Sequence, residues 1–186
     1  MLSSWNIHYH RWVIDDGEPE REAGERFQWR ILGYGSADGL TATTESKLCA
    51  IEEPDYSYHV VAKVIHASSK ASVIDFGLTA VGSRDLLPNA SQVGEYVTGR
   101  IALFFEHSID PVRQHIIESM THEWTVEEVF ADLTPYRSID SSGRRLIRCA
   151  QRVSYEQIVS TREKNANSYV LRCSLAPFGT TFQAGR

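Results

Sequence analysis

The segment from 58 to 107 most constrains the fold, because its residue pattern predicts three consecutive β-strands. In the first, over 58–67, both faces are mostly apolar and rich in β-branched residues, which is typical of a strand covered on each side. Ser68-Ser69-Lys70 then interrupts the pattern like a turn. Alternation resumes over 72–81 and again over 96–105, so the whole segment is predicted to meander as a sheet.

Two glycines, Gly77 and Gly99, lie inside the expected strands, where glycine often marks a bulge or a sharp coil. Long meandering strands with internal glycines are similar to the opening of a small closed barrel, such as the oligonucleotide- and oligosaccharide-binding (OB) fold. This is an analogy of architecture, and architecture does not confer function. No motif in the chain identifies a known family.

The N-terminal region predicts a hairpin over 5–32. Alternating apolar residues in 5–13 and 27–31 suit two strands, and the polar loop Asp15–Arg26 between them carries six acidic residues. The following region, 33–53, is rich in small residues and is expected to be mainly loop, with one short strand near 48–51.

Two short helices are predicted within 111–134. Asp110 and Pro111 suit an N-cap and a first helical position, and apolar residues then recur every fourth position. Thr125 and Glu128 form a capping box for the second helix, and Pro135 follows it. C-terminal strands are expected within 144–176. The predicted fold class is therefore α+β, mainly antiparallel sheet with a partly closed OB-like barrel, in one domain spanning 1–186.

Composition excludes several classes of protein. The 42% hydrophobic content is enough for a core and argues against wholesale disorder. No apolar run approaches the roughly 20 residues that span a bilayer, so no membrane partner is expected. Three cysteines without metal spacing and the lack of a secretory pattern favour a reduced, cytoplasmic setting. No nucleotide-binding motif is present, and no cofactor is expected.

The net charge of −5 conceals a division along the chain. Residues 1–136 contain 10 Lys and Arg against 21 Asp and Glu, whereas residues 137–186 contain 9 against 3. Either the two parts pack together and neutralise each other, or each presents a field to a different partner. We favour the first interpretation, because surface charge often segregates along a single-domain sequence without functional meaning.

A metal-dependent hydrolase is one alternative function. His115, Glu118 and His122 would share one side of a continuous helix and could bind a transition metal. The spacing differs from the HExxH pattern, and the second capping box begins close to His122. A solvated polar face explains these residues more simply.

Single-stranded nucleic-acid binding is a second alternative. Arg144, Arg148 and Arg152 recur every fourth residue and could contact phosphates, while Tyr96 and Arg100 lie on one face of an OB-like strand. The acidic total disfavours this function, because phosphate binding normally needs a dominant basic surface.

Because no catalytic constellation is complete, the favoured hypothesis is a non-catalytic binding module. The acidic loop, through Glu18, Glu20 and Glu22, together with exposed aromatics would recognise a protein partner, and a basic one suits this charge best.

Overall fold

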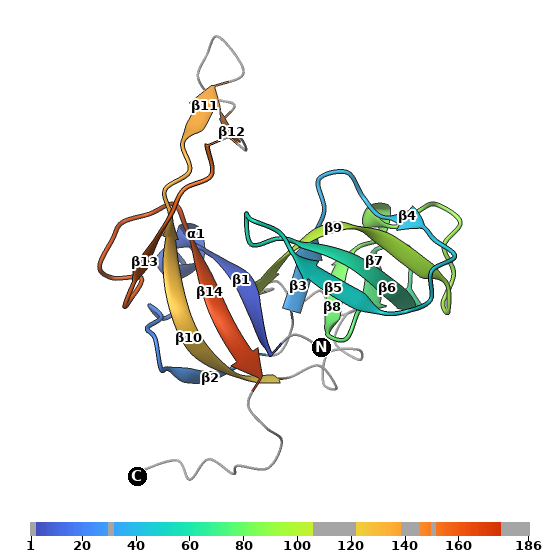
Figure 1. Ribbon diagram of the computed structural model, residues 1–186, viewed down its shortest axis with the longest axis horizontal. Coiled ribbons are helices and arrows are strands. Elements are labelled where there is room, and N and C mark those ends of the chain that lie inside the picture. Colours follow the sequence, from blue (N-terminus) through green and yellow to red (C-terminus); the bar gives the residue numbers. More distant parts are fainter. Residues whose placement is uncertain (1–2, 30–31, 106–121, 139–145, 150–151, 176–186) are drawn as a thin grey trace.

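The computed structural model describes residues 3–29, 32–105, 122–138, 146–149 and 152–175. Within these residues the chain is mostly strand, with one five-residue helix, α1 (Arg11–Asp15), and a short 3₁₀ turn, η1 (Arg84–Leu86). None of the described helices has the length and apolar character needed to cross a membrane. Figure 1 shows the strands in two groups that lie side by side, with a hairpin projecting from one of them.

The first group is a closed barrel of five strands. Its members are β3 (Leu32–Gly35), β6 (Tyr58–Ala67), β7 (Ala71–Asp75), β8 (Thr79–Ser83) and β9 (Tyr96–Phe105). β6 closes the barrel, because its first half pairs with β9 and its second half with β7, with a bulge between Val64 and His66. β3 lies between β9 and β8, antiparallel to the former and parallel to the latter.

The predicted central meander is confirmed as strand, but the single strand expected over 72–81 is wrong. The chain reverses between β7 and β8, where the Asp75 carboxylate accepts a hydrogen bond of 2.9 Å from the Gly77 N–H. Gly77 has a φ of 100°, a backbone conformation that glycine adopts without the steric cost of a Cβ. Gly77 is therefore a turn residue and not a bulge within one strand.

The second group is built around β14, which lies between β1 and β10 and runs antiparallel to both. The other side of β10 pairs with β2 at its start and with β13 at its end. One parallel bridge between His8 and Phe104 joins β1 to β9, so both groups belong to one sheet. The bounds of these strands are β1 (Ser4–His10), β2 (Arg26–Trp29), β10 (His122–Asp132), β13 (Tyr155–Ile158) and β14 (Ser168–Leu175).

The predicted N-terminal hairpin is wrong in its pairing. Both strands exist, but β1 pairs with β14 and β2 pairs with β10. Alternation specifies which face of a strand is apolar and not which strand lies beside it. Within the polar loop expected over Asp15–Arg26, residues 21–25 run along β10 and the segment after β13.

The second predicted helix is also wrong, because its residues form the long strand β10. Trp124, Val126, Val129 and Ala131 face the core, and a bulge between Val126 and Glu128 changes the spacing from two residues to three. The capping-box pattern of Thr125 and Glu128, which indicated a helix, thus occurs here within a strand. The first predicted helix, with residues 111–120, lies outside the described residues.

The remaining strands are short. The strand expected near 48–51 is confirmed as β5, which pairs with β6, while β4 pairs with β9. β11 and β12 form the separate hairpin. Their bounds are β4 (Thr41–Ala42), β5 (Cys49–Glu52), β11 (Tyr136–Ser138) and β12 (Leu146–Arg148).

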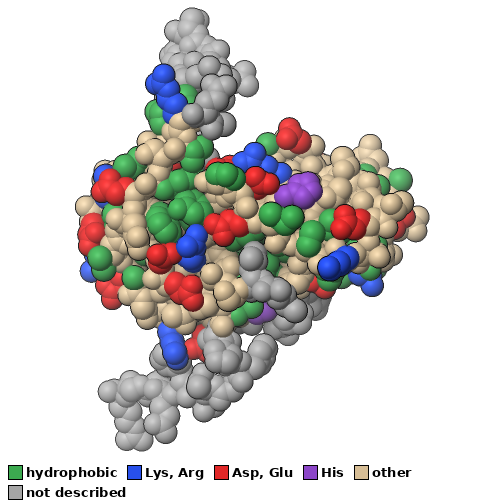
Figure 2. Space-filling model, viewed as in Figure 1, with side chains coloured by type: hydrophobic (Ala, Val, Ile, Leu, Met, Phe, Trp, Pro, Cys, Tyr) green, Lys and Arg blue, Asp and Glu red, His purple; other side chains and the backbone are tan. Residues whose placement is uncertain are grey.

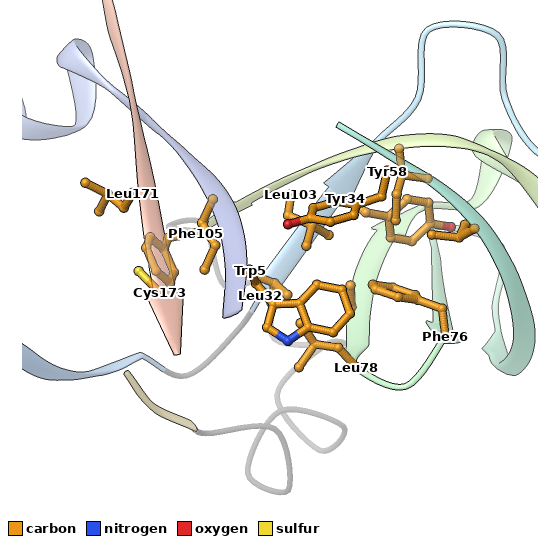
Figure 3. Packing of buried hydrophobic residues seen from close by; sticks show 14 of the residues in the cluster. Trp5, Leu32, Tyr34, Tyr58, Phe76, Leu78, Leu103, Phe105, Leu171 and Cys173 are labelled. Carbon is orange, nitrogen blue, oxygen red and sulfur yellow. The ribbon is translucent and has the colours of Figure 1, made fainter. Parts of the chain in front are cut away.

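One continuous cluster of buried side chains runs from the barrel interior into the second group (Figure 3). Trp5, on β1, packs between the two: its ring centroid lies 5.4 Å from that of Tyr58 and 5.6 Å from that of Phe76. On the side of the second group, the Phe105 ring centroid lies 6.1 Å from that of Trp124. This shared core fixes the position of the barrel against β10 and β14.

Candidate interaction surface between the barrel and the second group of strands

The predicted acidic loop is held against the second group of strands. The Arg21 N–H donates to Thr161 Oγ1 at 3.0 Å, and this hydroxyl in turn donates to the Glu20 carboxylate. Glu18 and Glu20 are half-buried, whereas Glu22 is exposed. Of the three acids predicted to meet a partner, Glu22 is therefore the one whose side chain the fold leaves most open to solvent.

Arg21 explains why this loop is ordered. Its side chain is buried, its guanidinium carbon lies 4.1 Å from the centroid of the Phe27 ring, and it forms an ion pair with Glu25. A buried guanidinium needs both a counter-charge and an aromatic face to offset the loss of its hydration. The acidic loop thus contributes to the core as well as to the surface.

Tyr96 and Arg100 lie on the outer face of β9, as the sequence predicted. The Tyr96 side chain is half-buried, whereas that of Arg100 is 56% exposed. Arg100 forms an ion pair with Asp55 and donates a hydrogen bond of 2.7 Å from Nε to Ser57 Oγ. Burial alone would raise the pKa of Asp55, but the hydrogen bonds from Arg100 and Ser57 outweigh it and lower the pKa to about 2.

The predicted arginine stripe is not assembled within the described residues. Arg144 lies outside them, Arg148 belongs to β12, and Arg152 is exposed after it. Its contribution to phosphate binding stays a prediction.

The predicted metal ligands do not share one helix, because His122 begins strand β10. His122 is half-buried with its ring centroid 5.9 Å from that of Trp124, and burial lowers the pKa of His122. His115 and Glu118 lie outside the described residues. In the described part of the chain, no three metal-ligating side chains converge. Stoichiometric metal in protein purified without a histidine tag is the test of the hydrolase alternative.

A cluster that the sequence did not predict lies where the barrel meets the second group. The connection from β5 to β6 brings Tyr56 against Phe130 of β10 and Tyr155 of β13, at ring-centroid distances of 5.2 and 4.5 Å. The Tyr155 hydroxyl donates a hydrogen bond of 3.0 Å to the Asp55 carbonyl. All three rings are half-buried, so each has part of its surface open to solvent. We call Tyr56, Phe130 and Tyr155 the junction cluster.

Arg172 of β14 occupies the rim of the junction cluster. Its guanidinium carbon lies 5.9 Å from the Tyr56 ring centroid and 5.6 Å from that of Phe130. Nη1 is 2.9 Å from a Glu128 carboxylate oxygen, and Nη2 is 3.2 Å from one of Glu52. The cation is therefore held by the aromatic faces and two carboxylates together, which fixes its orientation.

Tyr56 has a left-handed backbone conformation, with a φ of 62°. Among the described residues other than glycine, no other has a positive φ. This conformation is costly for a bulky residue, and such strain is often found at functional positions. Asp55 shapes the turn by accepting hydrogen bonds from the Ser57 N–H at 3.3 Å and the Ser57 hydroxyl at 2.6 Å. The turn thereby presents the Tyr56 ring toward β10.

The surface seen in Figure 2 mixes hydrophobic side chains over β10 and β14 with acidic and basic ones around them. Asp55 stays ionised near neutral pH because its pKa is about 2, and burial raises the pKa of Tyr56 above its ordinary value of 10.0. The surface offers ring faces and fixed hydrogen-bonding groups to a ligand.

Some turn chemistry of the junction cluster is visible in the sequence, since Pro54-Asp55 before Tyr56 and Ser57 favours a turn. Its partners are not visible there, because Phe130 and Tyr155 are remote in the chain. Comparisons of the chain with models of protein families, with curated proteins and with solved structures found no match.

Proposed function

We propose that the protein is a non-catalytic binding module that recognises a protein partner through the junction cluster. The observation that carries this proposal is a centre of half-exposed aromatic rings, Tyr56, Phe130 and Tyr155, bordered by Arg172 and its carboxylates. Tyrosine, phenylalanine and arginine are enriched at protein interfaces, where an aromatic centre and a polar rim supply most of the binding energy.

The strained turn supports the same function. Because Tyr56 is held in place before any partner arrives, its ring loses little conformational freedom on binding. Glu22 has a secondary role as an exposed acid that steers a basic partner toward the protein. Glu22→Lys should therefore slow association at low salt while leaving dissociation nearly unchanged.

An affinity pull-down from native lysate tests the proposal. Wild type and the control Val93→Ala, which changes an exposed side chain in a loop of the barrel, should retain one dominant protein after nuclease treatment. Tyr56→Gly and Phe130→Ala should lose it. Equal recovery with all four baits, or no partner with any of them, would contradict the proposal.

A second function, single-stranded nucleic-acid binding, is favoured by the order of the barrel strands. The meander β6–β7–β8, with β9 returning beside β6, is similar to the first four strands of an OB fold. β3 takes the fifth position next to β8, although it comes first in the chain. Tyr96 and Arg100 share the outer face of β9, as this function requires.

Two observations support nucleic-acid binding less than they support protein binding. OB folds bind oligonucleotides across their second and third strands, and the corresponding outer residues here, Val73 and Val81, are only 1% and 2% exposed. Arg100 is engaged by Asp55 and Ser57. Recovery that disappears with nuclease, and affinity that falls steeply with salt, would favour nucleic acid over a protein partner.

A further inference from the structure

Strand β5 lies at the edge of the sheet on the barrel side. It pairs with β6, and within the described residues no strand pairs with its other side. Its four residues contain no proline, and its register with β6 contains no bulge. Prolines and bulges are two means by which proteins protect an edge from further pairing. The open side of β5 can therefore accept another strand.

The register with β6 identifies the backbone groups that face this open side. Residues paired in antiparallel strands alternate between those that exchange hydrogen bonds and those that do not. The Glu53 N–H donates to the Ser57 carbonyl at 2.8 Å, so Ile51, two residues earlier, also bonds to β6. The N–H and C=O groups of Ala50 and Glu52 consequently point away from β6. These four groups have no hydrogen-bond partner among the described residues.

Hydrogen bonds on the other side of β6 agree with this alternation. The Val64 N–H donates to the Glu95 carbonyl at 2.9 Å, and the Val64 carbonyl accepts a bond of 2.8 Å from the Gly94 N–H. Val64 therefore bonds away from β5. Residues an odd number of positions before it bond toward β5, and His59, the partner of Ile51, is one of them.

The open edge is continuous with the junction cluster. The Glu52 side chain is 3.2 Å from Nη2 of Arg172 on the rim of the cluster. β5 also leads directly into the turn that carries Tyr56, and this turn reaches toward the second group of strands (Figure 1). On the opposite face of β5, Ile51 is 59% exposed, and an apolar residue of an added strand would cover it.

An extended peptide suits this edge better than a second copy of the chain does. The four residues of β5 span about 13 Å, and pairing along this length supplies only part of the roughly 1,200 Å² that a stable dimer buries. Two copies would also repel each other, because each has a net charge of −5. A peptide added to an edge gains its affinity from main-chain hydrogen bonds and a few side-chain contacts.

We propose that the protein partner presents an extended segment that pairs with the open edge of β5. This inference rests on the proposed function, because it names the form in which the partner binds. The segment exchanges hydrogen bonds with the N–H and C=O groups of Ala50 and Glu52 and places an apolar side chain beside Ile51. The partner then continues onto the ring of Tyr56.

Hydrogen exchange of the ¹⁵N-labelled full chain tests the pairing, with peptides selected from a phage-displayed random library as the probe. The amides of Ala50 and Glu52 should exchange rapidly in the free protein and at least about tenfold more slowly with peptide bound. Failure to select any peptide, or unchanged exchange at both amides when a selected peptide is bound, would overturn the inference.

Methylation of the peptide amides, one at a time, tests the pairing without altering the protein. Affinity should fall at every second position of the bound segment, because alternate amides of a strand face its neighbour. Losses without this alternation, or no loss at any position, would contradict strand pairing.

Ala50→Pro removes one N–H from the open edge, where proline is tolerated, and should raise the dissociation constant for the peptide at least about tenfold. Gln28→Pro is the matched control on β2, another edge strand. The Val126 N–H donates to the Glu25 carbonyl at 2.9 Å, and the alternation from this pair directs the Gln28 N–H away from β10. The control should leave affinity unchanged, and equal affinity in the two variants would contradict the edge pairing.

Phe130→Ala separates this inference from the proposed function. Loss of peptide binding with both Ala50→Pro and Phe130→Ala would support the two together. Loss with Phe130→Ala alone would overturn the edge pairing and leave the junction cluster as the binding site. Loss with Ala50→Pro alone would support the edge pairing and contradict the role of the junction cluster.

Discussion

Replacing Tyr56 by glycine and, separately, by alanine measures the strain that the junction cluster holds in its turn. Both changes remove the ring from its contacts with Phe130, Tyr155 and Arg172. They differ in the backbone, because alanine keeps a Cβ at a φ of 62° and glycine does not. The difference between the two variants therefore isolates the cost of the left-handed conformation.

The expected magnitudes follow from these contacts. Each aromatic pair at ring-centroid distances of 5.2 and 4.5 Å is worth about 0.5 to 1.5 kcal/mol, so Tyr56→Ala should lower the free energy of unfolding by about 2 kcal/mol. A left-handed residue with a Cβ costs about 1 to 2 kcal/mol, so Tyr56→Gly should be less destabilising than Tyr56→Ala by about 1 kcal/mol.

Urea denaturation of both variants measures these differences, and Tyr96 supplies the matched control. Tyr96 lies in the extended strand β9, where glycine costs about 0.5 to 1 kcal/mol more than alanine. The order of stability should thus be reversed between the two sites. At Tyr56 the glycine variant should be more stable than the alanine variant, and at Tyr96 it should be less stable. If alanine equals or exceeds glycine at Tyr56, the reasoning from its backbone conformation is refuted.

Two further predictions concern the barrel. Gly82→Ala should destabilise by about 1 to 3 kcal/mol in thermal or urea unfolding, because its Cβ would lie 2.5 Å from the buried, hydrogen-bonded ring of Tyr34. The Cβ added by Gly33→Ala would meet a half-exposed ring that can move, so this change should lower stability less than Gly82→Ala does. Equal losses of stability in the two variants would contradict this packing. The pKa of Asp55 is about 2 in the folded protein against an ordinary 3.8. Its ionised carboxylate therefore stabilises the folded state fully above pH 4, and this stabilisation is lost as the pH falls toward 2. Asp55→Asn should remove about 1 kcal/mol of the loss in unfolding free energy that acid causes. This value is small because Arg100 is 56% exposed and solvent screens its ion pair with Asp55. An unchanged dependence of stability on pH would refute the ion pair.

Sequence patterns predicted the strands of the barrel better than they predicted where strands meet. Apolar, β-branched residues on both faces of 58–67 marked β6, and alternation over 96–105 marked β9. Pairing depends on distant segments, and so the expected N-terminal hairpin was replaced by contacts with β10 and β14. A periodic pattern contains no information about which remote segment of the chain is its partner.

The error over 125–134 has a more local cause. The helix was predicted from two local signals, a capping box and a proline that follows it. Thr125 and Glu128, which resemble a capping box, instead lie on the outer side of β10, where Glu128 pairs with Arg172. Pairing with β2, β13 and β14 satisfies the backbone of this segment along its length, and tertiary context therefore overrides its local signals.

The division of charge along the sequence is resolved partly at the junction cluster. Arg172 comes from the basic C-terminal part, and its two carboxylate partners, Glu52 and Glu128, come from the acidic part. Here the two parts neutralise each other, as the favoured interpretation of the sequence holds. A partner that docks on the junction cluster consequently meets charges that are already paired and oriented. These residues therefore produce no strongly positive or strongly negative potential. Selectivity at this surface must come from the shape of the ring faces and from hydrogen bonds to the rim, because the charges that border it are already matched.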